Sequence, residues 1–483
     1  MPILLKTVNH QEHQRLANDL IDNNRRFRKY FLHSFIPEQQ WKAFIGNKGK
    51  GWYYTVPASD TYESASWEWD LVHGILKDEV DPRGGLAEVI SNQNKDGFIP
   101  HMNFKGGDDE KFWGKPRHSF ITQPPIYGLL YDKFKSDEEA LEILYMAVMK
   151  NIDWWDQKRL KNDLPFTVHP WETGRDAGRD NDVLNLKYML GEEPKSMKLQ
   201  TINTGKKDYY AKKARFAIHD QLKEKGTNLS GAESDRFVLQ SPDMASHLVF
   251  TIEETIKYAR KKNRFNDVEK LEAIKQRVVK AAREQMWDDQ TGFFYSVGGK
   301  RPSRELLDEV KKELKKKDLE INESLYSVGD DGKILTKTIA GLMTLYSGIP
   351  DHDMAKALLS ALKSSDFNTT WPVPTVAKSD PGFVDDDYWR GSTWINTNYF
   401  IILGLERYAK EFREIGDVKT AKEFAEKGIQ LIQKTQELTY NHGFFEFYSS
   451  TGEGVMGNGP KDFTWSTLSV LLTKNLEELK RFL

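Results

Sequence analysis

Long amphipathic segments are the feature that most restricts how this chain can fold. Apolar residues recur with the i, i+3, i+4 spacing of one buried helix face in three segments, 137–159, 243–262 and 266–286. Further candidate helices are 10–33, 119–133, 351–362, 393–411, 417–438 and 463–481. Strict alternation of apolar and polar residues over five or more positions is rare, so any strands are short. The pattern predicts an all-α protein with elaborate connections.

A weak internal echo indicates how these helices are arranged. One helix is followed by MWDDQTGFFYSV, residues 286–297, and another by LTYNHGFFEFYSS, residues 438–450. Each is a polar turn followed by Gly-Phe-Phe and more aromatics, which favours helix hairpins set around a common axis. The second copy alone carries a carboxylate, Glu446, within its aromatic run. Burying it is costly unless it is paired or used, so it is either an outward-facing strand residue or a functional one.

Composition limits the organisation of the chain and its partners. No low-complexity linker interrupts the 483 residues, which favours one domain over 1–483, with charged stretches 191–235 and 298–336 as excursions. The second excursion includes a short amphipathic helix. The net charge of -2 gives no electrostatic reason to expect a nucleic-acid or acidic-membrane partner.

The sequence also predicts where the protein resides. The absence of cysteine excludes a disulfide framework, a thiolate metal site and a Cys nucleophile. The first residues lack the apolar run of a signal peptide, and no uninterrupted apolar segment reaches the roughly 18 residues that a membrane span needs. We therefore expect a cytoplasmic protein with no membrane partner. Its oligomeric state stays open, a homo-oligomer included.

Familiar metal, phosphate and nucleophile motifs are absent from the sequence. There is no HExxH, Walker loop, GxGxxG or GxSxG elbow, and the eleven histidines are scattered. We therefore expect neither a metal nor a cofactor. Paired carboxylates remain, and hydrolysis of a glycosidic bond needs one carboxyl held protonated and another ionised on opposite sides of the sugar.

The segment HPWETGRDAGRDND, residues 169–182, is the first place where such carboxylates gather. Prolines and glycines interrupt it, so it is a loop that follows a long helix. It contains two arginines, Arg175 and Arg179, and four acids, Glu172, Asp176, Asp180 and Asp182. Residue chemistry does not choose among the four acids, because neighbouring arginines lower a carboxyl pKa rather than raise it. Glu446 is the second candidate.

Other loops offer side chains suited to a sugar ring. TYESASWEWD, residues 61–70, ends in Trp69 and Asp70, an aromatic face beside a hydrogen-bond acceptor. HSFITQPPIYG offers Gln123, and DDDYWRGSTWINTNYF offers Tyr388 and Trp394 at the start of a helix. Eight tryptophans lie in or beside loops, where stacking on a ligand competes with core packing as an explanation: Trp52, Trp67, Trp69, Trp113, Trp171, Trp371, Trp389 and Trp394.

Taken together, these motifs resemble glycoside hydrolase family 63. The matching segments are HPWETG-x-D, YWRG-x-x-W-x-x-x-N, Trp-x-Trp-Asp, DGFIPH, and FFEFYSSTGEG followed by FTWS, in family order from about residue 50 to 470. Within the family the chain most resembles the short bacterial and plant hydrolases of mannosylglycerate and glucosylglycerate. The resemblance implies an (α/α)6 barrel with long loop excursions over the active-site end, and hydrolysis with inversion of configuration.

The resemblance also implies roles for individual residues. Asp176, two residues after the glycine of Trp-Glu-Thr-Gly, matches the catalytic acid, and Glu446 matches the catalytic base. Substrate contacts are implied for Tyr62, Trp69, Asp70, Gln123, Tyr388 and Trp394, with Arg236 matching an arginine that holds a glycerate carboxylate. If Asp176 is the acid, Arg175 and Arg179 must point away from it, because a paired carboxyl would be ionised.

We therefore expect an inverting exo-acting α-glycosidase that releases glucose or mannose from a small glycoside such as glucosylglycerate or mannosylglycerate. Its partner would be a small carbohydrate substrate. Two departures from the family pattern, Ala177-Gly178 and Ser392, lie with the 191–235 excursion on the leaving-group side and leave the aglycone open. Three alternatives remain: an α-glucosidase on di- or oligosaccharides, a sugar epimerase on a similar barrel using His101 and His169, and a non-catalytic carbohydrate-binding barrel.

Overall fold

The protein is mostly helical. The computed structural model describes residues 8–29, 35–46, 50–62, 65–199, 209–227 and 236–483. Within these ranges it has seventeen α-helices and five two-stranded antiparallel ladders, with strands of two to five residues. The expected helical character and the short strands are confirmed. The closing of the helices into a barrel, and the division into one domain with excursions, stay predictions.

The first third of the chain alternates helices with short strands. Its helices are α1 (His10–Asn23), α2 (Glu38–Ile45), α3 (Glu68–Lys77), α4 (Pro82–Ile90), α5 (Asp108–Trp113), α6 (Leu129–Lys133) and α7 (Glu138–Lys158). Its strands pair as β1 (Arg25–Lys29) with β2 (Gly51–Thr55), β3 (Ser66–Trp67) with β4 (Met102–Asn103), and β5 (Leu160–Lys161) with β6 (Leu164–Pro165).

The remainder is dominated by longer helices. They are α8 (Asp182–Asn185), α9 (Tyr209–Lys225), α10 (Pro242–Lys261), α11 (Phe265–Gln285), α12 (Arg304–Lys315), α13 (Ile339–Met343), α14 (His352–Lys363), α15 (Ile395–Glu414), α16 (Val418–His442) and α17 (Leu468–Lys480). Strand β7 (Trp287–Asp288) pairs with β8 (Phe293–Phe294), and β9 (Phe445–Phe447) with β10 (Asn458–Lys461). The two Gly-Phe-Phe copies thus follow α11 and α16, and each begins or completes a short ladder.

The three strongest helix predictions are confirmed as α7, α10 and α11. Two others are wrong in extent. Within its described part, the segment 10–33 is helical only to Asn23, after which the chain continues as β1; residues 30–33 lie outside the described residues. The segment 119–133 is irregular as far as Gly128, and only α6 is helical. Pro124 and Pro125 explain this difference, since a proline removes a helical N–H donor and disfavours the helical conformation of the residue before it.

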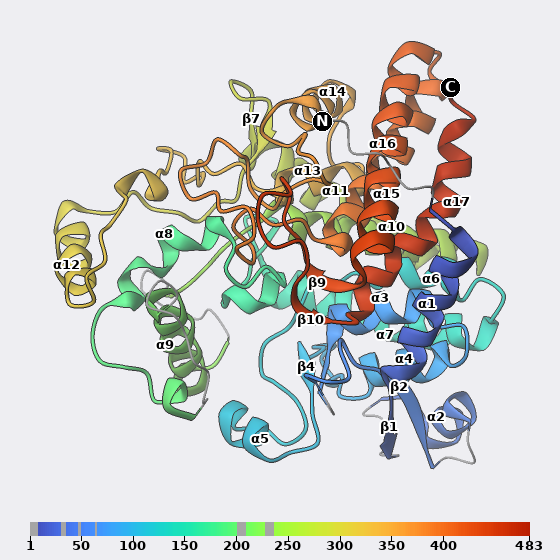
Figure 1. Cartoon of the computed structure of the whole chain (residues 1–483). Coiled ribbons are helices and arrows are strands. Elements are labelled where there is room, and N and C mark those ends of the chain that lie inside the picture. Colours follow the sequence, from blue (N-terminus) through green and yellow to red (C-terminus); the bar gives the residue numbers. More distant parts are fainter. Residues whose placement is uncertain (1–7, 30–34, 47–49, 63–64, 200–208, 228–235) are drawn as a thin grey trace.

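Helices that follow one another along the chain pack together and enclose the main apolar core. Helix α10 packs on α11, and α16 packs on both α15 and α17. The last three stand side by side in Figure 1 (orange to red). Of these helices, α16 is capped by a side chain: Asp417 accepts a hydrogen bond from the N–H of Thr420 at its start. Gly443, with φ of +90°, ends α16 and turns the chain into β9.

The stretch 191–235 differs from its expected character. Within its described part, α9 buries Tyr210, Phe216, Ile218 and Leu222. These side chains join a second apolar cluster that also contains Val310 and Leu314 of α12, and the Tyr210 hydroxyl donates to the carbonyl of Glu313 at 2.6 Å. The many lysines of α9 concealed this buried face, because long lysine stems cover apolar surface themselves. Residues 200–208 and 228–235 lie outside the described residues.

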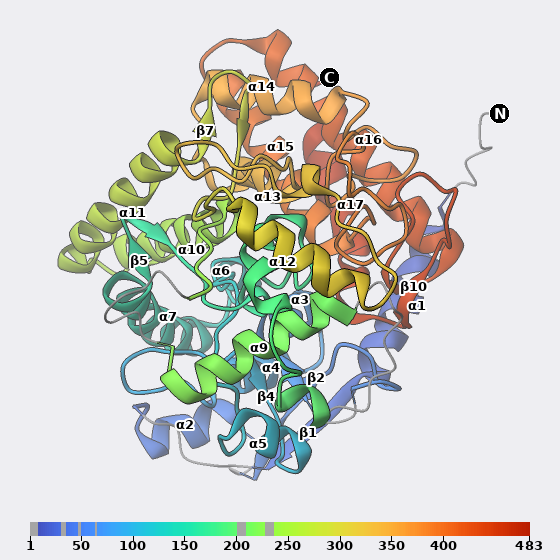
Figure 2. The ribbon, with the colours of Figure 1, turned by 90° about the vertical axis from the view of Figure 1, so that its left-hand side faces the viewer.

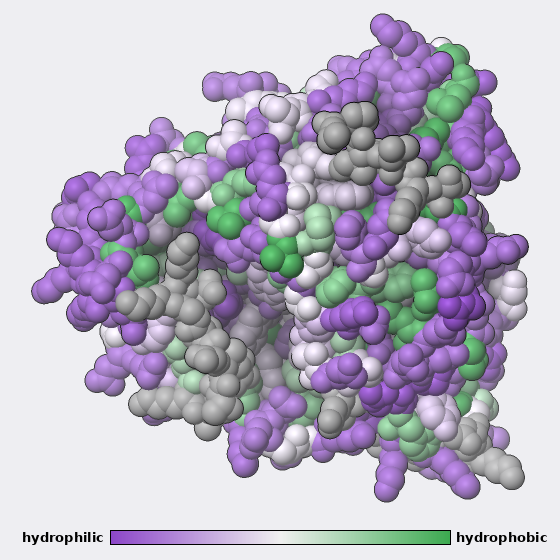
Figure 3. All heavy atoms as spheres, in the orientation of Figure 1, coloured by the Kyte–Doolittle hydropathy of each residue, from purple (hydrophilic) through white to green (hydrophobic). Residues whose placement is uncertain are grey.

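Helices α9 and α12 form a lobe beside the body of the molecule. Figure 2 shows both running across the same face, and Figure 3 shows a hollow between this lobe and the body. The surface in that view is largely hydrophilic. In the part of the chain that the structure describes, no helix has both the length and the apolar character to cross a membrane.

A buried carboxylate connects the ladder of β1 and β2 to strand β3, which leads into α3. Glu88 on α4 is fully buried and accepts hydrogen bonds from the Arg28 guanidinium, from Trp52 Nε1 at 2.9 Å and from Ser66 Oγ at 2.8 Å. Ser66 begins β3, which runs directly into α3 with Trp69 and Asp70. Every oxygen of this carboxylate therefore has a partner, as burial requires.

We predict that Glu88→Gln lowers the stability of the fold by about 3–5 kcal/mol, because it leaves the buried Arg28 charge without its counterion. The midpoint of chemical unfolding measures the change. Glu12→Gln is the control, since it removes only an exposed pair with Arg15 and is expected to leave the midpoint where it was. Equal midpoints for both variants would contradict the prediction.

Candidate active site

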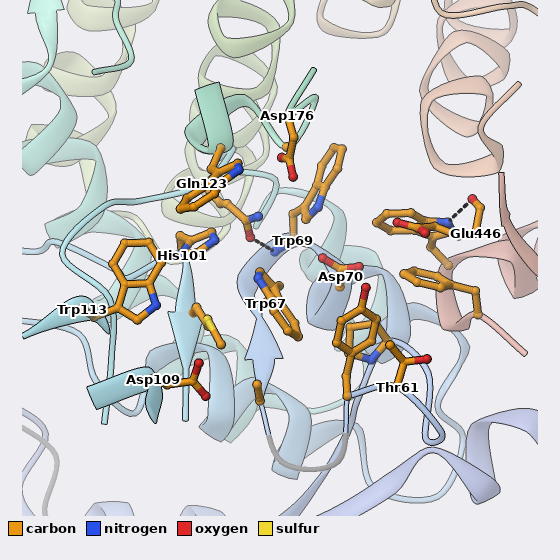
Figure 4. Close-up of a pocket in the computed structure, with 18 of the residues that line it drawn as sticks. Thr61, Trp67, Trp69, Asp70, His101, Asp109, Trp113, Gln123, Asp176 and Glu446 are labelled. Carbon is orange, nitrogen blue, oxygen red and sulfur yellow. Dashed lines mark hydrogen bonds between the residues drawn. The ribbon is translucent and has the colours of Figure 1, made fainter. Parts of the chain in front are cut away.

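A cavity of about 640 Å³ gathers most of the residues that the sequence singled out. The cavity is lined by residues from segments spread over nearly 400 positions: Tyr62, Trp69, Asp70, Gln123, Asp176, Tyr388 and Glu446. Four further tryptophans line it as well: Trp67, Trp113, Trp171 and Trp465. In Figure 4, Asp176 and Glu446 approach the same space from different segments, with Asp70 and Trp69 between them. Carboxyls among aromatic faces are the chemistry of a carbohydrate site.

The structure distinguishes the four acids of the 169–182 loop. Glu172 accepts two hydrogen bonds from Arg159 and others from the N–H groups of Thr122 and Val168. Asp180 and Asp182 are each held by arginines. Of the four, Asp176 alone lines the cavity. The choice that residue chemistry left open is thus made by the packing of the loop.

The two arginines that flank Asp176 bind other acids. Arg175 pairs with Asp180 at 3.0 Å and with Asp243 at 2.6 Å, and both acids are as deeply buried as the arginine itself. Arg179 pairs with Asp182 and, at 2.9 Å, with Asp380. The prediction that both arginines point away from Asp176 is confirmed. The charge of each guanidinium is paired with these other acids, in bidentate and branched ion pairs outside the cavity.

Burial raises the pKa of both candidate catalytic carboxyls. The pKa of Asp176 rises to about 7, although the Arg215 charge and a hydrogen bond from Tyr388 act to lower it. The pKa of Glu446 rises to about 8 because of burial and the nearby charge of Asp176. Burial and these same two carboxyls also raise the pKa of Asp70 well above its usual range. The cavity therefore holds a coupled group of carboxyls that retains protons at neutral pH.

The backbone around Glu446 fixes its place. Glu446 lies in the middle of β9, and its carbonyl oxygen accepts a hydrogen bond from Trp465 Nε1 at 3.0 Å. Across the ladder Gly459, with φ of +71°, packs directly on the carboxylate, so that a Cβ there would lie 2.2 Å from Oε2. Only glycine permits this approach without displacing Glu446.

The floor of the cavity is fixed in a similar way. The N–H of Trp69 donates to Gln123 Oε1 at 3.1 Å, which orients the glutamine amide in the cavity (Figure 4). Gly174, with φ of +71°, ends the short 3-10 helix Pro170–Thr173 directly against the Trp69 ring. A Cβ on Gly174 would lie 2.4 Å from that ring. The glycine before Asp176 thus lets the acid loop and the aromatic floor touch.

The histidines do not form the acid–base pair that an epimerase would need. His101 lines the cavity, where burial lowers its pKa to about 3. His169 lies outside the lining: its Nδ1 accepts from the N–H of Trp171 and its Nε2 contacts the carbonyl of Arg215. Among the described residues, no three His, Asp or Glu side chains gather as metal ligands would.

Two of the expected contact residues lie elsewhere. Trp394 is fully buried, stacked 3.7 Å from Trp389 and 5.0 Å from Phe447 between ring centroids, so it supports the cavity wall from behind. Arg236 lines a different hollow, and its guanidinium donates to the carbonyls of Lys225 and Gly226 at the end of α9. A place beside the substrate is therefore not supported for either residue. Because a long stretch separates the acid loop from Arg236, no neighbouring motif indicated where Arg236 lies in the structure.

The sequence missed several residues of the site. Asp109, Phe112 and Met102 line the cavity, and Arg215 on α9 is close enough to lower the pKa of Asp176. Arg215 carried no signal because it lies among lysines in a stretch interpreted as a charged excursion. Phe463 and Trp465 also line the cavity. Their FTWS motif was noted in the sequence only as part of the resemblance to the family, and no role was expected for either residue.

Comparison with known proteins shows the family of the chain. Residues 62–466 match the model of the mannosylglycerate hydrolase MGH1-like glycoside hydrolase domain. A mannosylglycerate hydrolase of Thermus thermophilus is 24% identical over 450 residues, which cover 86% of this chain and 96% of that protein. One of Selaginella moellendorffii is 25% identical over 446 residues, covering 86% of this chain and 81% of the relative.

Solved structures show the same fold. The crystal structure of the glycoside hydrolase family 63 mannosylglycerate hydrolase of Thermus thermophilus with Tris superposes with a TM-score of 0.68 at 22% identity, over 87% of this chain and 96% of the other. The neutral trehalase of Saccharomyces cerevisiae has a TM-score of 0.52 at 15% identity, over 99% of this chain and 83% of the other. With the family model matching most of its length, the chain belongs to the mannosylglycerate hydrolase MGH1-like family of glycoside hydrolases.

Proposed function

We propose that the protein is an inverting exo-acting α-glycosidase that releases glucose or mannose from a small glycoside such as glucosylglycerate or mannosylglycerate. Its helices would close into an (α/α)6 barrel, with the cavity at the loop-rich end. The observation that carries the proposal is the pair of buried carboxyls, Asp176 and Glu446, facing one cavity walled by tryptophans. The related enzymes that hydrolyse mannosylglycerate support the substrate class.

The reaction uses the two carboxyls in complementary states. The reactive form of the coupled pair has its single proton on Asp176 and not on Glu446, the carboxyl of higher pKa. In that form Glu446 removes a proton from a water molecule, whose oxygen attacks the anomeric carbon. Asp176, protonated, donates its proton to the glycosidic oxygen as the carbon–oxygen bond breaks, and the aglycone leaves as an alcohol. A gap of roughly 6.5–9.5 Å between the carboxyls leaves room for the water, and attack from the face opposite the leaving group inverts the anomeric carbon.

Arg215 is the cation we assign to a carboxylate on the aglycone, in place of Arg236. Its charge acts on both Asp176 and Tyr388, so it lies on the side of the cavity where the acid meets the leaving group. A guanidinium suits a carboxylate through paired N–H donors. The Thermus thermophilus enzyme has been crystallised with D-glycerate, which fits a ligand of this kind.

A bound carboxylate would also adjust the acid. The Arg215 charge lowers the pKa of Asp176, which opposes proton retention. Pairing of Arg215 with the aglycone offsets that charge and raises the pKa of Asp176. The substrate would thereby help to protonate the residue that must donate to it, which gives an electrostatic reason for a glycerate aglycone.

Removal of either carboxyl is expected to lower kcat by about 10²- to 10⁴-fold, the usual contribution of a general acid or base. The variants are Asp176→Asn and Glu446→Gln, with Glu453→Gln as the control because Glu453 is an exposed acid in the loop after β9. Proton NMR of the first product detects the β-anomer if the reaction inverts. Full activity in Glu446→Gln would contradict the assignment of Glu446 as the base. An α-anomer as the first product would contradict the inverting mechanism.

The pH dependence of kcat/KM is expected to be bell-shaped, with its maximum around pH 7 to 8. Burial raises the pKa values of Asp176 and Glu446 to about 7 and about 8, and the pair titrates as a unit. Activity falls as the pH drops and the base binds a proton, and it falls again as the pH rises and the acid loses its proton. An acidic limb near pH 4, typical of exposed carboxyls, would contradict the prediction.

Paired substrates test the role of Arg215. Glucosylglycerol differs from glucosylglycerate by a hydroxymethyl group in place of the carboxylate. Arg215→Gln is expected to lower kcat/KM for glucosylglycerate by about 10- to 150-fold, the value of one charged hydrogen bond, and to affect glucosylglycerol much less. Arg236→Gln is the matched control and should change neither rate. Equal losses on both substrates would refute the assignment.

Hydrolysis rates on a wider set of glycosides decide among the alternative functions. Faster hydrolysis of kojibiose or trehalose than of either glycerate glycoside would favour an α-glucosidase acting on disaccharides. Calorimetric binding without product would favour a non-catalytic carbohydrate-binding protein.

A further inference from the structure

One short segment, residues 385–390, contacts both of the loops that carry the catalytic carboxyls. Its two ends are held together: the N–H of Val384 donates to the carbonyl of Arg390 at 2.8 Å, and Gly391 passes so close that a Cβ would lie 2.4 Å from the carbonyl oxygen of Val384. The segment is therefore a closed loop, and its side chains extend from a fixed base.

Asp385 holds the loop that follows Glu446. Its carboxylate accepts hydrogen bonds from the hydroxyls of Ser449 and Ser450 and from the N–H groups of Thr451 and Gly454, the last three at 2.9, 2.6 and 3.0 Å. These bonds keep the pKa of Asp385 below its ordinary value, although burial acts to raise it. A carboxylate with this many donors orders the backbone around it.

Arg390 holds the loop that follows Asp176. Its guanidinium binds both carboxylate oxygens of Asp182, at 2.7 and 3.0 Å, and reaches the carbonyl of Ala177 at 3.4 Å. Asp182 is bound at the same time by Arg179. The hydrogen bond from Arg390 to the carbonyl of Ala177 therefore holds the residue directly after Asp176.

Tyr388 lies at the middle of the segment and faces both carboxyls. It hydrogen-bonds Asp176, and its ring centroid is 5.5 Å from that of Phe447, the neighbour of Glu446 in β9. Its φ of +29° is rare for a residue with a side chain, and its carbonyl accepts from Trp394 Nε1 at 2.8 Å. Strained backbone of this kind persists where the surroundings determine it, as they do here from both sides.

We propose that the segment 385–390 sets the separation of Asp176 and Glu446, with Asp385 and Arg390 as positioning residues. The proposal rests on the catalytic roles given above. Inversion needs a gap that admits a water molecule on one side and a leaving group on the other, so a misplaced carboxyl slows the reaction without changing its chemistry. Arg390 would then govern the step that uses the acid, and Asp385 the step that uses the base.

A glycosyl fluoride distinguishes the contribution of the acid from that of the base. In α-glucosyl fluoride the carbon–fluorine bond breaks and fluoride leaves without a proton, so no acid is needed. Water still attacks the anomeric carbon, and the base still takes its proton. The substrate therefore depends on Glu446 and not on Asp176, whereas glucosylglycerate depends on both.

We expect Arg390→Gln to slow glucosylglycerate hydrolysis by about 10- to 100-fold and to leave the fluoride within about threefold, because only the acid moves. Asp385→Asn should slow both substrates by similar factors, because the base moves. Arg390→Lys should recover part of the loss, since lysine restores the charge without the paired donors. Asp366→Asn is the matched control, because Asp366 also binds a backbone N–H, that of Ser379, yet contacts neither loop.

The proposal fails if Arg390→Gln slows both substrates equally, or if Asp385→Asn spares the fluoride. Circular dichroism and the unfolding midpoint show whether a variant is folded, and a misfolded Asp385→Asn is replaced by Ser450→Ala, which removes one of its bonds and should give the same pattern more weakly. If the wild-type protein hydrolyses neither these substrates nor the matching mannosylglycerate and α-mannosyl fluoride, the proposed function fails instead. A wild type active on both substrates, with equal ratios in every variant, refutes the positioning role alone.

Discussion

The site depends on keeping positive charge away from one carboxyl. Asp176 lies between two arginines in the sequence, and either of them could hold it permanently ionised. The fold prevents this by giving each arginine other acids, Asp243 for Arg175 and Asp380 for Arg179. Because these ion pairs are buried, their charges are compensated at short range, and the loop can be rich in charge while its own arginines leave Asp176 unpaired by them.

The same loop needs close packing as much as charge compensation. Gly174 lets the loop touch the ring of Trp69, and Gly459 lets the opposite strand cover Glu446. Both glycines adopt a left-handed conformation that costs little without a Cβ. The aromatic floor and the two carboxyls are therefore placed by backbone contacts, which leave less freedom than side-chain contacts alone would.

Some of this could be predicted from the sequence, and the reasons differ by residue. Helices such as α7 and α10 have an apolar period strong enough to identify them, and the family motifs around Asp176 and Glu446 marked the candidate acid and base. The partners of the arginines could not be found, because Asp243 and Asp380 are separated from them by 68 and 201 positions. Trp69 and Trp394 both lie near the start of a helix, and only the packing shows that one faces the cavity and the other the core. Arg215 was concealed by the lysines around it on α9.

The position of His169 ties two parts of the site together. One ring nitrogen accepts a hydrogen bond from the backbone at Trp171, and the other binds the carbonyl of Arg215 on α9. The helix that carries the cation is thus held to the loop of Asp176 at the residue whose charge acts on that carboxyl. A single imidazole ring therefore fixes the charge and the carboxyl relative to each other.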